Sequence, residues 1–304
     1  MALETDIHLS YWRNIQDSRR SFVYIILLSH SNSQNMSRIG PLLSIIIGLM
    51  LLSSCDLFDV HPYDGDIKGK RNINQANIEK IERDLKDKDT IRYALISDSQ
   101  RWYDELDDFV DFANKRDDLD FIIHAGDLSD FGLTKEFLIQ RDILEKLHQP
   151  YVALIGNHDV LANGEDIFRI VFGPLNFSFI AGRTKFVCLN TNALESDYSN
   201  PIPDFSYIQS EREARKDEFN QTVFVMHAKP TSEQFNNNVK DVFQYSIKQF
   251  PNLLYGNHGH DHRYQNEDIF KDGIYYYGTP NIGKRQFLLF TVTQNSYTHE
   301  IISF

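Results

Sequence analysis

The chain has 304 residues, of which 43 are acidic and 31 are lysine or arginine, so its formal charge is −12. This length allows one large domain or two small ones, and the composition is that of an ordinary globular protein with many aromatic residues. A surface this acidic lacks the basic footprint that nucleic-acid-binding proteins use, which argues against nucleic acid as a partner.

The N-terminal end shows the pattern of an export signal. Residues 1–35 fit no folding pattern, and we interpret them as a disordered extension or an upstream artefact of gene calling. From Met36, a short charged region, an apolar stretch and small residues follow one another, which is typical of a secretory signal peptide over residues 36–54. The apolar stretch is short for a membrane span, although a single membrane anchor is the alternative.

The residues that close this signal indicate a lipid anchor. Leu52-Ser53-Ser54-Cys55 resembles the lipobox of bacterial lipoproteins, in which the cysteine is acylated and becomes the first mature residue. The resemblance implies a protein attached to a membrane of the bacterial cell envelope through Cys55, facing the periplasm or the exterior. Residues 55–89 are polar and charged, and they predict a tether with a helix around 77–86 before a domain at 90–304.

A repeated strand–helix pattern follows. Three apolar segments, at 91–96, 119–125 and 151–155, are typical of buried strands. The segments between them carry apolar residues at helical spacing, as Leu106 and Phe109 show. Strand, helix and strand in this order favour right-handed crossovers and neighbouring parallel strands.

The second half of the chain predicts a further sheet with its own helices. A hairpin is expected around Gly182, and Cys188 on its second strand is expected to be a small buried side chain. Two more buried strands and two helices are expected, at 222–226, 252–255, 204–218 and 239–250. The tail holds three segments that are expected to form antiparallel strands, at 274–277, 287–292 and 298–304. We therefore predict an α/β fold of two packed mixed β-sheets flanked by helices.

Polar residues stand where the predicted strands end, the position at which open α/β sheets place their sites. These candidate site residues are Asp98, Gln100, Asp127, Asn157, His158, His227, His260 and His262. Carboxylates, imidazoles and amide oxygens together suit divalent first-row metals such as Mn, Fe or Zn. The ligands are too many for one ion and enough for two, and two neighbouring ions clamp the attacking and leaving oxygens in phosphoryl chemistry.

Two polar features have plainer explanations. Taken alone, Gly156-Asn157-His158-Asp159 could be a polar turn in which Asp159 caps the next helix, but three other strands end in the same way. His124 lies inside a strand, and we expect it to be a hydrogen-bonded core histidine rather than a ligand.

The motifs resemble those of the calcineurin-like metallophosphoesterases, from Ile91 to about Gly283. In the family's order, they are Gly126-Asp127 with Asp130 three residues later, Gly156-Asn157-His158-Asp159, a lone His227, and Gly259-His260-Asp261-His262. The first motif departs from the family's Asp-x-His, because this chain has Asp98-Ser99-Gln100. The resemblance implies the family's four-layer sandwich.

The resemblance also implies a dinuclear site with defined roles. One ion would take Asp98, Gln100, Asp127 and His262, and the other would take Asp127, Asn157, His227 and His260, so that Asp127 bridges them. His158 would contact the phosphate and protonate the leaving oxygen, with the Asp130 carboxylate orienting it, while a metal-bound hydroxide attacks phosphorus in line. Because an amide oxygen is a weaker ligand than imidazole, we expect the first ion to bind less tightly or to be a harder ion such as Mn.

The expected function is a metal-dependent phosphoesterase that hydrolyses a phosphomonoester, phosphodiester or pyrophosphate bond of a small phosphorylated substrate. The alternative is a lipoprotein of the same fold that binds metal or phosphate without catalysis, with Gln100 marking decay of the site. Retention of His158 and Asp130 favours the enzyme, because metal binding does not require them. The sequence leaves the oligomeric state open.

Overall fold

The computed structural model describes residues 67–196, 200–294 and 296–304. The predicted extension at 1–35, the signal at 36–54 and the anchor at Cys55 lie outside these described residues. The helices within these ranges all fall short of the length and hydrophobicity that a membrane span requires.

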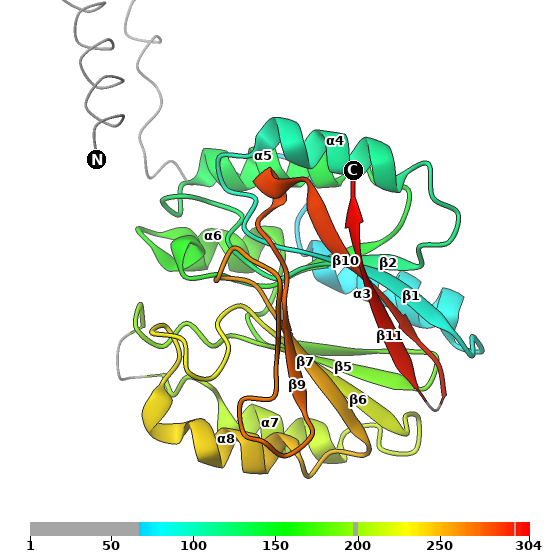
Figure 1. Ribbon diagram of the computed structural model, residues 1–304. Coiled ribbons are helices and arrows are strands. Elements are labelled where there is room, and N and C mark those ends of the chain that lie inside the picture. Colours follow the sequence, from blue (N-terminus) through cyan, green and yellow to red (C-terminus); the bar gives the residue numbers. More distant parts are fainter. Residues whose placement is uncertain (1–66, 197–199, 295) are drawn as a thin grey trace, which may run out of the picture. The chain divides into compact units, whose positions relative to one another are not determined.

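The described residues form two mixed β-sheets that pack face to face (Figure 1). The first sheet has the strand order β11-β10-β1-β2-β3. Its strands are β1 (Ile91–Ile96), β2 (Phe121–His124), β3 (Tyr151–Ala153), β10 (Gln286–Val292) and β11 (Tyr297–Ser303). As the strand–helix pattern predicts, β1, β2 and β3 run parallel, and β10 lies antiparallel between β1 and β11.

The second sheet has the strand order β4-β5-β6-β7-β9-β8. Its strands are β4 (Phe177–Ala181), β5 (Thr184–Leu189), β6 (Gln221–Met226), β7 (Leu253–His258), β8 (Gln265–Glu267) and β9 (Tyr275–Gly278). The prediction of a wholly antiparallel tail is wrong for β9, which pairs in parallel with β7 and antiparallel with β8. An apolar pattern identifies a strand but not the direction of its neighbours, and the short polar β8 gave no such pattern.

Helices cover the outer faces of both sheets (Figure 1). The first sheet carries α4 (Tyr103–Ala113), α5 (Thr134–Leu144) and α6 (Gly164–Val171), and the second carries α7 (Phe205–Glu213) and α8 (Lys240–Ile247). Short 3-10 helices occur at η2 (His158–Val160), η3 (Asn237–Val239) and η4 (Ile282–Lys284). The helical spacing seen in the sequence is the buried face of α4, where Leu106 and Phe109 are fully covered. The predicted four-layer sandwich is confirmed.

Helix α3 (Ile73–Leu85) closes one side of the sandwich, because it packs against the edge strands β3 and β4. Its Ile81 is fully buried, and the Asn74 side chain bonds both backbone groups of Ala153, at 2.8 and 2.9 Å. The helix predicted around 77–86 thus starts earlier and belongs to the folded body, which begins before residue 90. The apolar residues of this helix alternate with charged ones along the chain, so the segment has the composition of a tether. In the helix, however, these apolar residues gather on one face.

Aromatic rings fill the layer between the two sheets. Tyr93 stacks against Phe121 and Phe290, with ring centroids 5.2 Å apart in both pairs. Phe186 of the second sheet meets Tyr93 edge-on at 5.3 Å and stacks on Phe179 at 4.9 Å. Each such pair contributes about 0.5–1.5 kcal/mol beyond the burial of its surface. Since these rings come from both sheets, they hold the sheets together and fix the relative positions of the strand ends.

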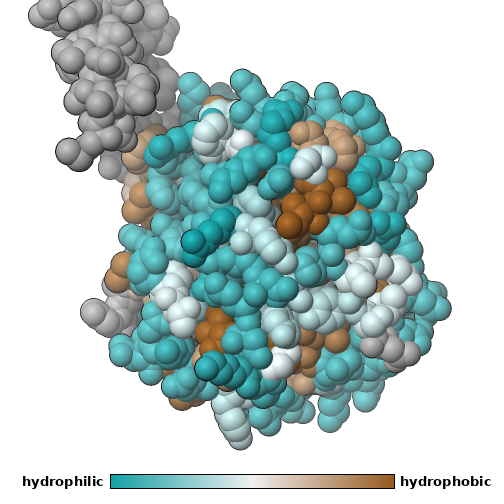
Figure 2. All heavy atoms as spheres, viewed as in Figure 1, coloured by the Kyte–Doolittle hydropathy of each residue, from teal (hydrophilic) through white to brown (hydrophobic). Residues whose placement is uncertain are grey.

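Polar residues dominate the face of the molecule that is seen in Figure 2, and hydrophobic residues gather there in small separate patches. On α8, Val242 and Tyr245 are exposed and border a groove shared with α7. Cys188, by contrast, is buried in β5, as expected.

Candidate metal centre

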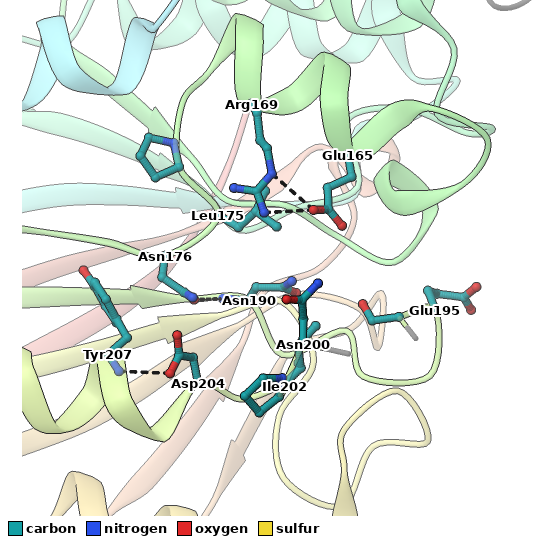
Figure 3. Close-up of a pocket in the computed structure, with 13 residues that line it drawn as sticks. Glu165, Arg169, Leu175, Asn176, Asn190, Glu195, Asn200, Ile202, Asp204 and Tyr207 are labelled. Atoms are coloured by element: carbon teal, nitrogen blue, oxygen red, sulfur yellow. Dashed lines mark hydrogen bonds and ion pairs between the residues drawn. The ribbon is translucent and has the colours of Figure 1, made fainter. Parts of the chain in front are cut away.

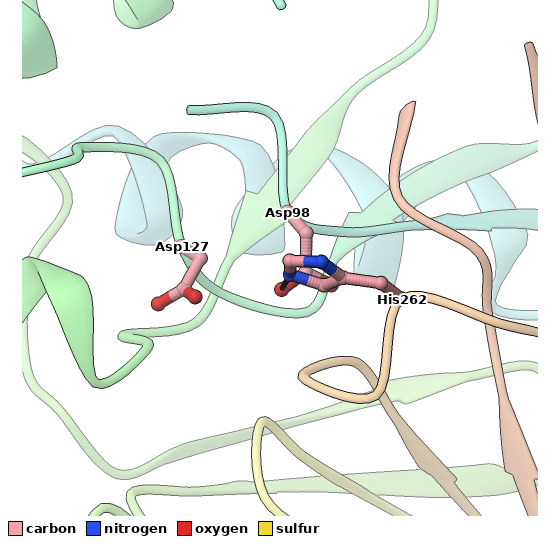
Figure 4. A group of neighbouring side chains, drawn as sticks. All are labelled: Asp98, Asp127 and His262. Carbon is pink, nitrogen blue, oxygen red and sulfur yellow. Dashed lines mark ion pairs between the residues drawn. The ribbon is translucent and has the colours of Figure 1, made fainter. Parts of the chain in front are cut away.

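The loops after β1, β2, β3, β6 and β7 carry the candidate ligands, and the fold brings these loops together. Asp98, Asp127 and His262 form what we call the first ligand group, whose donor atoms all lie within 4.8 Å of one another (Figure 4). His262 Nε2 is 3.1 Å from Asp98 Oδ1. Three of the four ligands predicted for the first ion are therefore neighbours.

Asn157, His227 and His260 form the second ligand group. The Asn157 Oδ1 atom lies 3.0 Å from His227 Nε2 and 3.0 Å from His260 Nδ1. Asp127 joins the two groups, because its Oδ2 lies 3.4 Å from His227 Nε2. Asp127 therefore lies between the two ligand groups.

The charge and burial of the first ligand group fit divalent cations. Asp98 and Asp127 are 0% and 1% exposed, and buried carboxylates this close repel each other unless positive charge lies between them. Burial opposes ionisation of Asp127, yet His227 and His158 lower its pKa to about 2, so it stays charged. Two of the buried side-chain oxygens that lack a regular hydrogen bond lie here, namely Asp98 Oδ1, which has His262 Nε2 at 3.1 Å, and Gln100 Oε1. A cation bound by the first ligand group would satisfy Asp98 Oδ1.

A main-chain hydrogen bond to Nδ1 sets the orientation of the His227 ring. Its Nδ1 lies 2.7 Å from the carbonyl oxygen of Ala125, which can only accept, so Nδ1 carries the proton in that bond. In the neutral ring, Nε2 then points its lone pair at the oxygens of Asn157 and Asp127, and such a contact needs a proton or a metal ion between the atoms. Burial lowers the pKa of His227, but the carboxylates of Asp127 and Asp98 outweigh burial and raise it to about 10.

His260 shows the same arrangement with a side-chain acceptor. Its Nε2 lies 2.9 Å from Glu233 Oε1, and its Nδ1 faces Asn157 Oδ1. A carboxylate behind a histidine fixes the tautomer and strengthens the ligand. Sequence reasoning missed Glu233, because it belongs to no motif and its contact depends on the loop after β6 folding over the loop after β7.

Four candidate ligands adopt left-handed backbone conformations, namely Asp98 (φ 54°), Asp127 (φ 60°), His260 (φ 66°) and His262 (φ 54°). This conformation costs about 1–2 kcal/mol for a residue with a Cβ. Strained backbone of this kind gathers at functional sites, where the surrounding fold enforces it. These loops therefore adopt the backbone conformations that the ligand groups require, against the local preference of the residues.

Two motif glycines allow the loops to approach closely. A Cβ on Gly156 would lie 2.1 Å from Asp127 Oδ1, and a Cβ on Gly259 would lie 2.0 Å from Ser97 Oγ. No side chain fits at such distances, so glycine is needed at both positions for close contact between loops.

Asp159 ties the loop after β2 to the loop after β3. Its Oδ2 accepts the N–H groups of Asp127 and Gly156 at 2.9 and 2.8 Å, and its Oδ1 accepts the N–H and hydroxyl of Ser129 at 2.7 and 2.9 Å. Burial and the Asp127 carboxylate raise the pKa of Asp159 to about 7, against the effect of these hydrogen bonds. The alternative in which Asp159 caps the next helix is wrong, since α6 begins only at Gly164.

Gln100 lies beside the first ligand group but presents a donor to it. Its Nε2 is 3.3 Å from Asp127 Oδ2. Coordination through Oε1 requires a half-turn of the amide, which would bring the oxygen to the position that the nitrogen occupies. Gln100 is therefore the predicted ligand whose present orientation is farthest from coordination.

His158 stands beside both ligand groups. The main-chain N–H of His158 donates to Asp127 Oδ1 at 3.0 Å. The ring Nδ1 lies 2.9 Å from the main-chain carbonyl oxygen of Asp130. That carbonyl leaves Nε2 as the nitrogen that can meet a substrate atom. The Asp130 carboxylate, predicted to orient His158, is 3.7 Å from Nδ1 and instead accepts hydrogen bonds from Arg101 at 2.6 and 2.7 Å. The structure thus holds His158 through the main chain of Asp130.

His124 is a hydrogen-bonded core residue, as expected. It is fully buried, and its Nε2 lies 2.7 Å from Ser99 Oγ in the loop after β1. Burial lowers its pKa to about 4, so the ring is neutral. His124 supports the loop that carries Asp98 and Gln100.

A separate pocket lies near the end of β5 (Figure 3). Its volume is about 450 Å³, and its walls include Glu165, Arg169, Asn176, Asn190, Asp204 and Tyr207. Arg169 already pairs with Glu165 at 2.8 Å, and Asp204 accepts the Tyr207 N–H at 3.0 Å. None of the candidate ligands lines this pocket. Converging donor atoms, rather than pocket volume, therefore identify the candidate centre.

Comparison with solved structures shows where this fold occurs. GAP50, the anchor in the inner membrane complex of Plasmodium, is similar with a TM-score of 0.52 and 12% identity, over 71% of this chain and 85% of that chain. Purple acid phosphatase PPD1 from yellow lupin seeds has a TM-score of 0.53 and 12% identity, over 70% of this chain and 51% of the phosphatase chain. TT1561 of Thermus thermophilus has a TM-score of 0.50 and 11% identity, over 70% of this chain and 99% of the TT1561 chain. At these identities the likeness concerns the fold alone. A comparison with curated protein sequences finds no match.

The sequence itself matches a family. Residues 91–280 match the family model described as Metallophos, calcineurin-like phosphoesterase. The matched range begins at the first residue of β1, ends just after β9 and includes every candidate ligand. The match covers more than half of the chain and supports metal-dependent hydrolysis of phosphate esters as the general chemistry. This chain therefore belongs to the calcineurin-like phosphoesterase family.

Proposed function

We propose that this protein is a phosphoesterase that hydrolyses a small phosphorylated substrate with the help of two divalent ions, Mn, Fe or Zn. The observation that carries the proposal is the position of Asp127. It belongs to the first ligand group and also lies 3.4 Å from His227 of the second. The first ligand group with Gln100 would hold one ion, and the second ligand group with Asp127 would hold the other.

The chain's own residues would position and protonate the substrate. When bound, the ions would supply Lewis-acid polarisation of the phosphate and lower the pKa of an attacking water. His158 would protonate the leaving oxygen through Nε2, because Nδ1 is held by the Asp130 carbonyl. The Asp127 carboxylate accepts a hydrogen bond from the main-chain N–H of His158 and so holds residue 158 beside the ligand groups.

Metal analysis and turnover together test the proposal. Protein loaded with Mn, Zn or Fe and dialysed should retain two ions per chain, and should hydrolyse p-nitrophenyl phosphate or bis-p-nitrophenyl phosphate. A chelator should remove both the metal and the activity. Substoichiometric metal after loading, together with turnover that a chelator does not affect, would refute the dinuclear site.

A binding protein of the same fold is the second candidate. The departure at Gln100 favours it, and the fold does not exclude it, because one similar structure is named as a phosphatase and another as an anchor. Full metal loading without turnover of any phosphate ester would support this candidate over the enzyme.

We also propose that Cys55 carries a lipid and holds the protein at the bacterial cell envelope. The lipobox-like sequence that ends at Cys55 supports this. In cells, Cys55→Ala should abolish lipid labelling and release the protein from membranes, because no other thiol lies nearby in the sequence. A Cys188→Ala variant is the matched control and should keep the label. A variant at position 55 that stays labelled would refute the anchor.

A further inference from the structure

Lys229 is a buried cation in the loop after β6, the loop that also carries the candidate ligand His227. The residue is 7% exposed. Its Nζ lies 3.0 Å from Glu267 Oε2 on the edge strand β8 and 3.9 Å from Asp261 Oδ2 in the loop after β7. A lysine buried to this degree needs negative partners, because removing its charge from water costs free energy. Since its partners belong to two other segments, Lys229 connects the loop after β6 with the loop after β7 and with β8.

Asp261 lies in the chain between His260 and His262, which belong to different ligand groups. Its Oδ2 atom is buried and has no regular hydrogen bond. His258 Nδ1 is 4.0 Å from this oxygen, but it lies 2.9 Å from a main-chain carbonyl oxygen, which can only accept and therefore takes the Nδ1 proton. Lys229 thus supplies the positive charge that the buried carboxylate oxygen of Asp261 faces.

The turn around Asp261 requires support from the rest of the fold. His260 and His262 both have left-handed backbone conformations, which are unfavourable for residues with a Cβ. Main-chain contacts hold the two ends of the turn: the His260 N–H donates to Asp98 Oδ2 at 3.1 Å, and the His262 carbonyl oxygen accepts from Lys284 Nζ at 2.7 Å. Between these ends, the side chain of Asp261 anchors the turn through its ion pair. A shift of Asp261 would therefore displace two ligands, one in each ligand group.

We propose that Lys229 is a positioning residue of the metal centre, which holds the Asp261 carboxylate and thereby places His260 and His262 for the two ions. This inference rests on the proposed function, because the residues that Lys229 positions are the ligands assigned there. Lys229 acts through Asp261 and is not itself a ligand, since its Nζ is directed at two carboxylates.

Lys229→Met tests the proposal, because it removes the charge and keeps an unbranched side chain. The full-length variant and the wild type are titrated with Mn alone in a calorimeter. Without its partner, the Asp261 carboxylate would leave its present position and take the turn with it. Both ions should then bind roughly 10–100-fold more weakly, the loss typical when an outer partner of metal ligands is removed. Unchanged or tighter binding of either ion would overturn the inference.

A double-mutant cycle separates positioning through Asp261 from simple packing of the Lys229 side chain. Asp261→Asn removes the carboxylate that Lys229 holds, so it should also weaken both ions. The double variant should bind them no more weakly than Lys229→Met alone, because the two residues act through one contact. Losses that add in the double variant would show that Lys229 and Asp261 act independently, which contradicts the proposal.

Lys248→Met is the matched control. Lys248 Nζ binds Asp272 Oδ2 at 2.9 Å, and Asp272 lies just before β9. Because β9 runs parallel to β7, this pair lies at the opposite end of the sheet from the ligands that follow β7. The variant should keep the affinity for both ions. A loss as large as that of Lys229→Met would show that the effect is not specific to Lys229.

Urea unfolding of the metal-free proteins shows whether Lys229→Met still folds. If it does not, Asp261→Asn decides the question, because it leaves Lys229 paired with Glu267, and unchanged metal affinity in that variant would overturn the inference. A wild type that binds no Mn would refute both this inference and the dinuclear site. A wild type that binds two ions but hydrolyses no phosphate ester would refute the enzymatic function alone, and the affinities of the variants would still decide the role of Lys229.

Discussion

The two ligand groups differ in how firmly the fold holds their side chains. In the second, the His227 side chain is fully buried and held by the Ala125 carbonyl, and His260 is held by Glu233. In the first, the two carboxylates are buried, but the His262 side chain is 47% exposed, and the neighbouring Gln100 turns an amide N–H rather than an oxygen toward Asp127. The main chain of His262 is nevertheless held, because Lys284 Nζ donates to its carbonyl oxygen at 2.7 Å.

In the proposed dinuclear centre, the second ligand group would need little rearrangement to hold its ion, whereas His262 and Gln100 would have to move toward the other ion. A preorganised set of ligands loses less conformational freedom when it binds, so it binds more tightly. We therefore expect one tightly held ion and one that exchanges readily, with the weaker position determined by His262 and Gln100.

The largest effect is expected from Asp127→Asn, because Asp127 contacts both ligand groups. The substitution keeps the shape of the side chain but removes its charge, so both ions should be lost and turnover should fall to background. Metal analysis after dialysis and turnover of p-nitrophenyl phosphate measure this. Retention of one tightly bound ion would show that Asp127 serves only the other group.

His158→Asn should leave both ligand groups intact and slow turnover by roughly 10²–10⁴-fold, the range for general acid catalysis. The loss should be largest with an alkyl phosphate and smaller with p-nitrophenyl phosphate, since a stable leaving group needs little protonation. Asp130→Asn should lose less, because the main-chain carbonyl that holds His158 is kept. Loss of metal in the His158 variant would instead identify His158 as a ligand.

Asp159→Asn should weaken the connection between the loops after β2 and β3. An amide nitrogen cannot accept the hydrogen bonds that one carboxylate oxygen accepts here, so stability should fall by about 1–3 kcal/mol. Urea unfolding of the metal-free protein measures this. Asp111→Asn, on the exposed face of α4, is the control and should change stability little. Equal stabilities of the two variants would contradict the role given to Asp159.

The smallest effect is expected from Gln100→His, which restores the family's Asp-x-His pattern. An imidazole is a better ligand for first-row metals than an amide oxygen, so the weaker ion should bind about tenfold more tightly. Stepwise metal titration followed by calorimetry separates the two ions, and the tighter ion is the internal control. An unchanged weaker ion would mean that residue 100 does not coordinate.

Much of this arrangement could be predicted from local patterns. Buried strands such as β1 and β6 are continuous apolar runs, and the polar residues that end them can only lie at the sheet edge. The spacing of Leu106 and Phe109 predicted the buried face of α4. The motifs around Asp98, Asp127 and His262 predicted a ligand cluster, and the three side chains are neighbours in the structure.

Other features depended on contacts between distant segments. The polar residues that follow the strands, and the chemistry they can perform, are readable from short stretches of sequence, because each motif spans only a few consecutive residues. The three-dimensional arrangement was needed to show that β9 runs parallel to β7, that α3 packs on the folded body, and that the Asp130 carboxylate binds Arg101. These outcomes depend on how loops far apart in the chain pack against one another, and local periodicity contains no information about that packing.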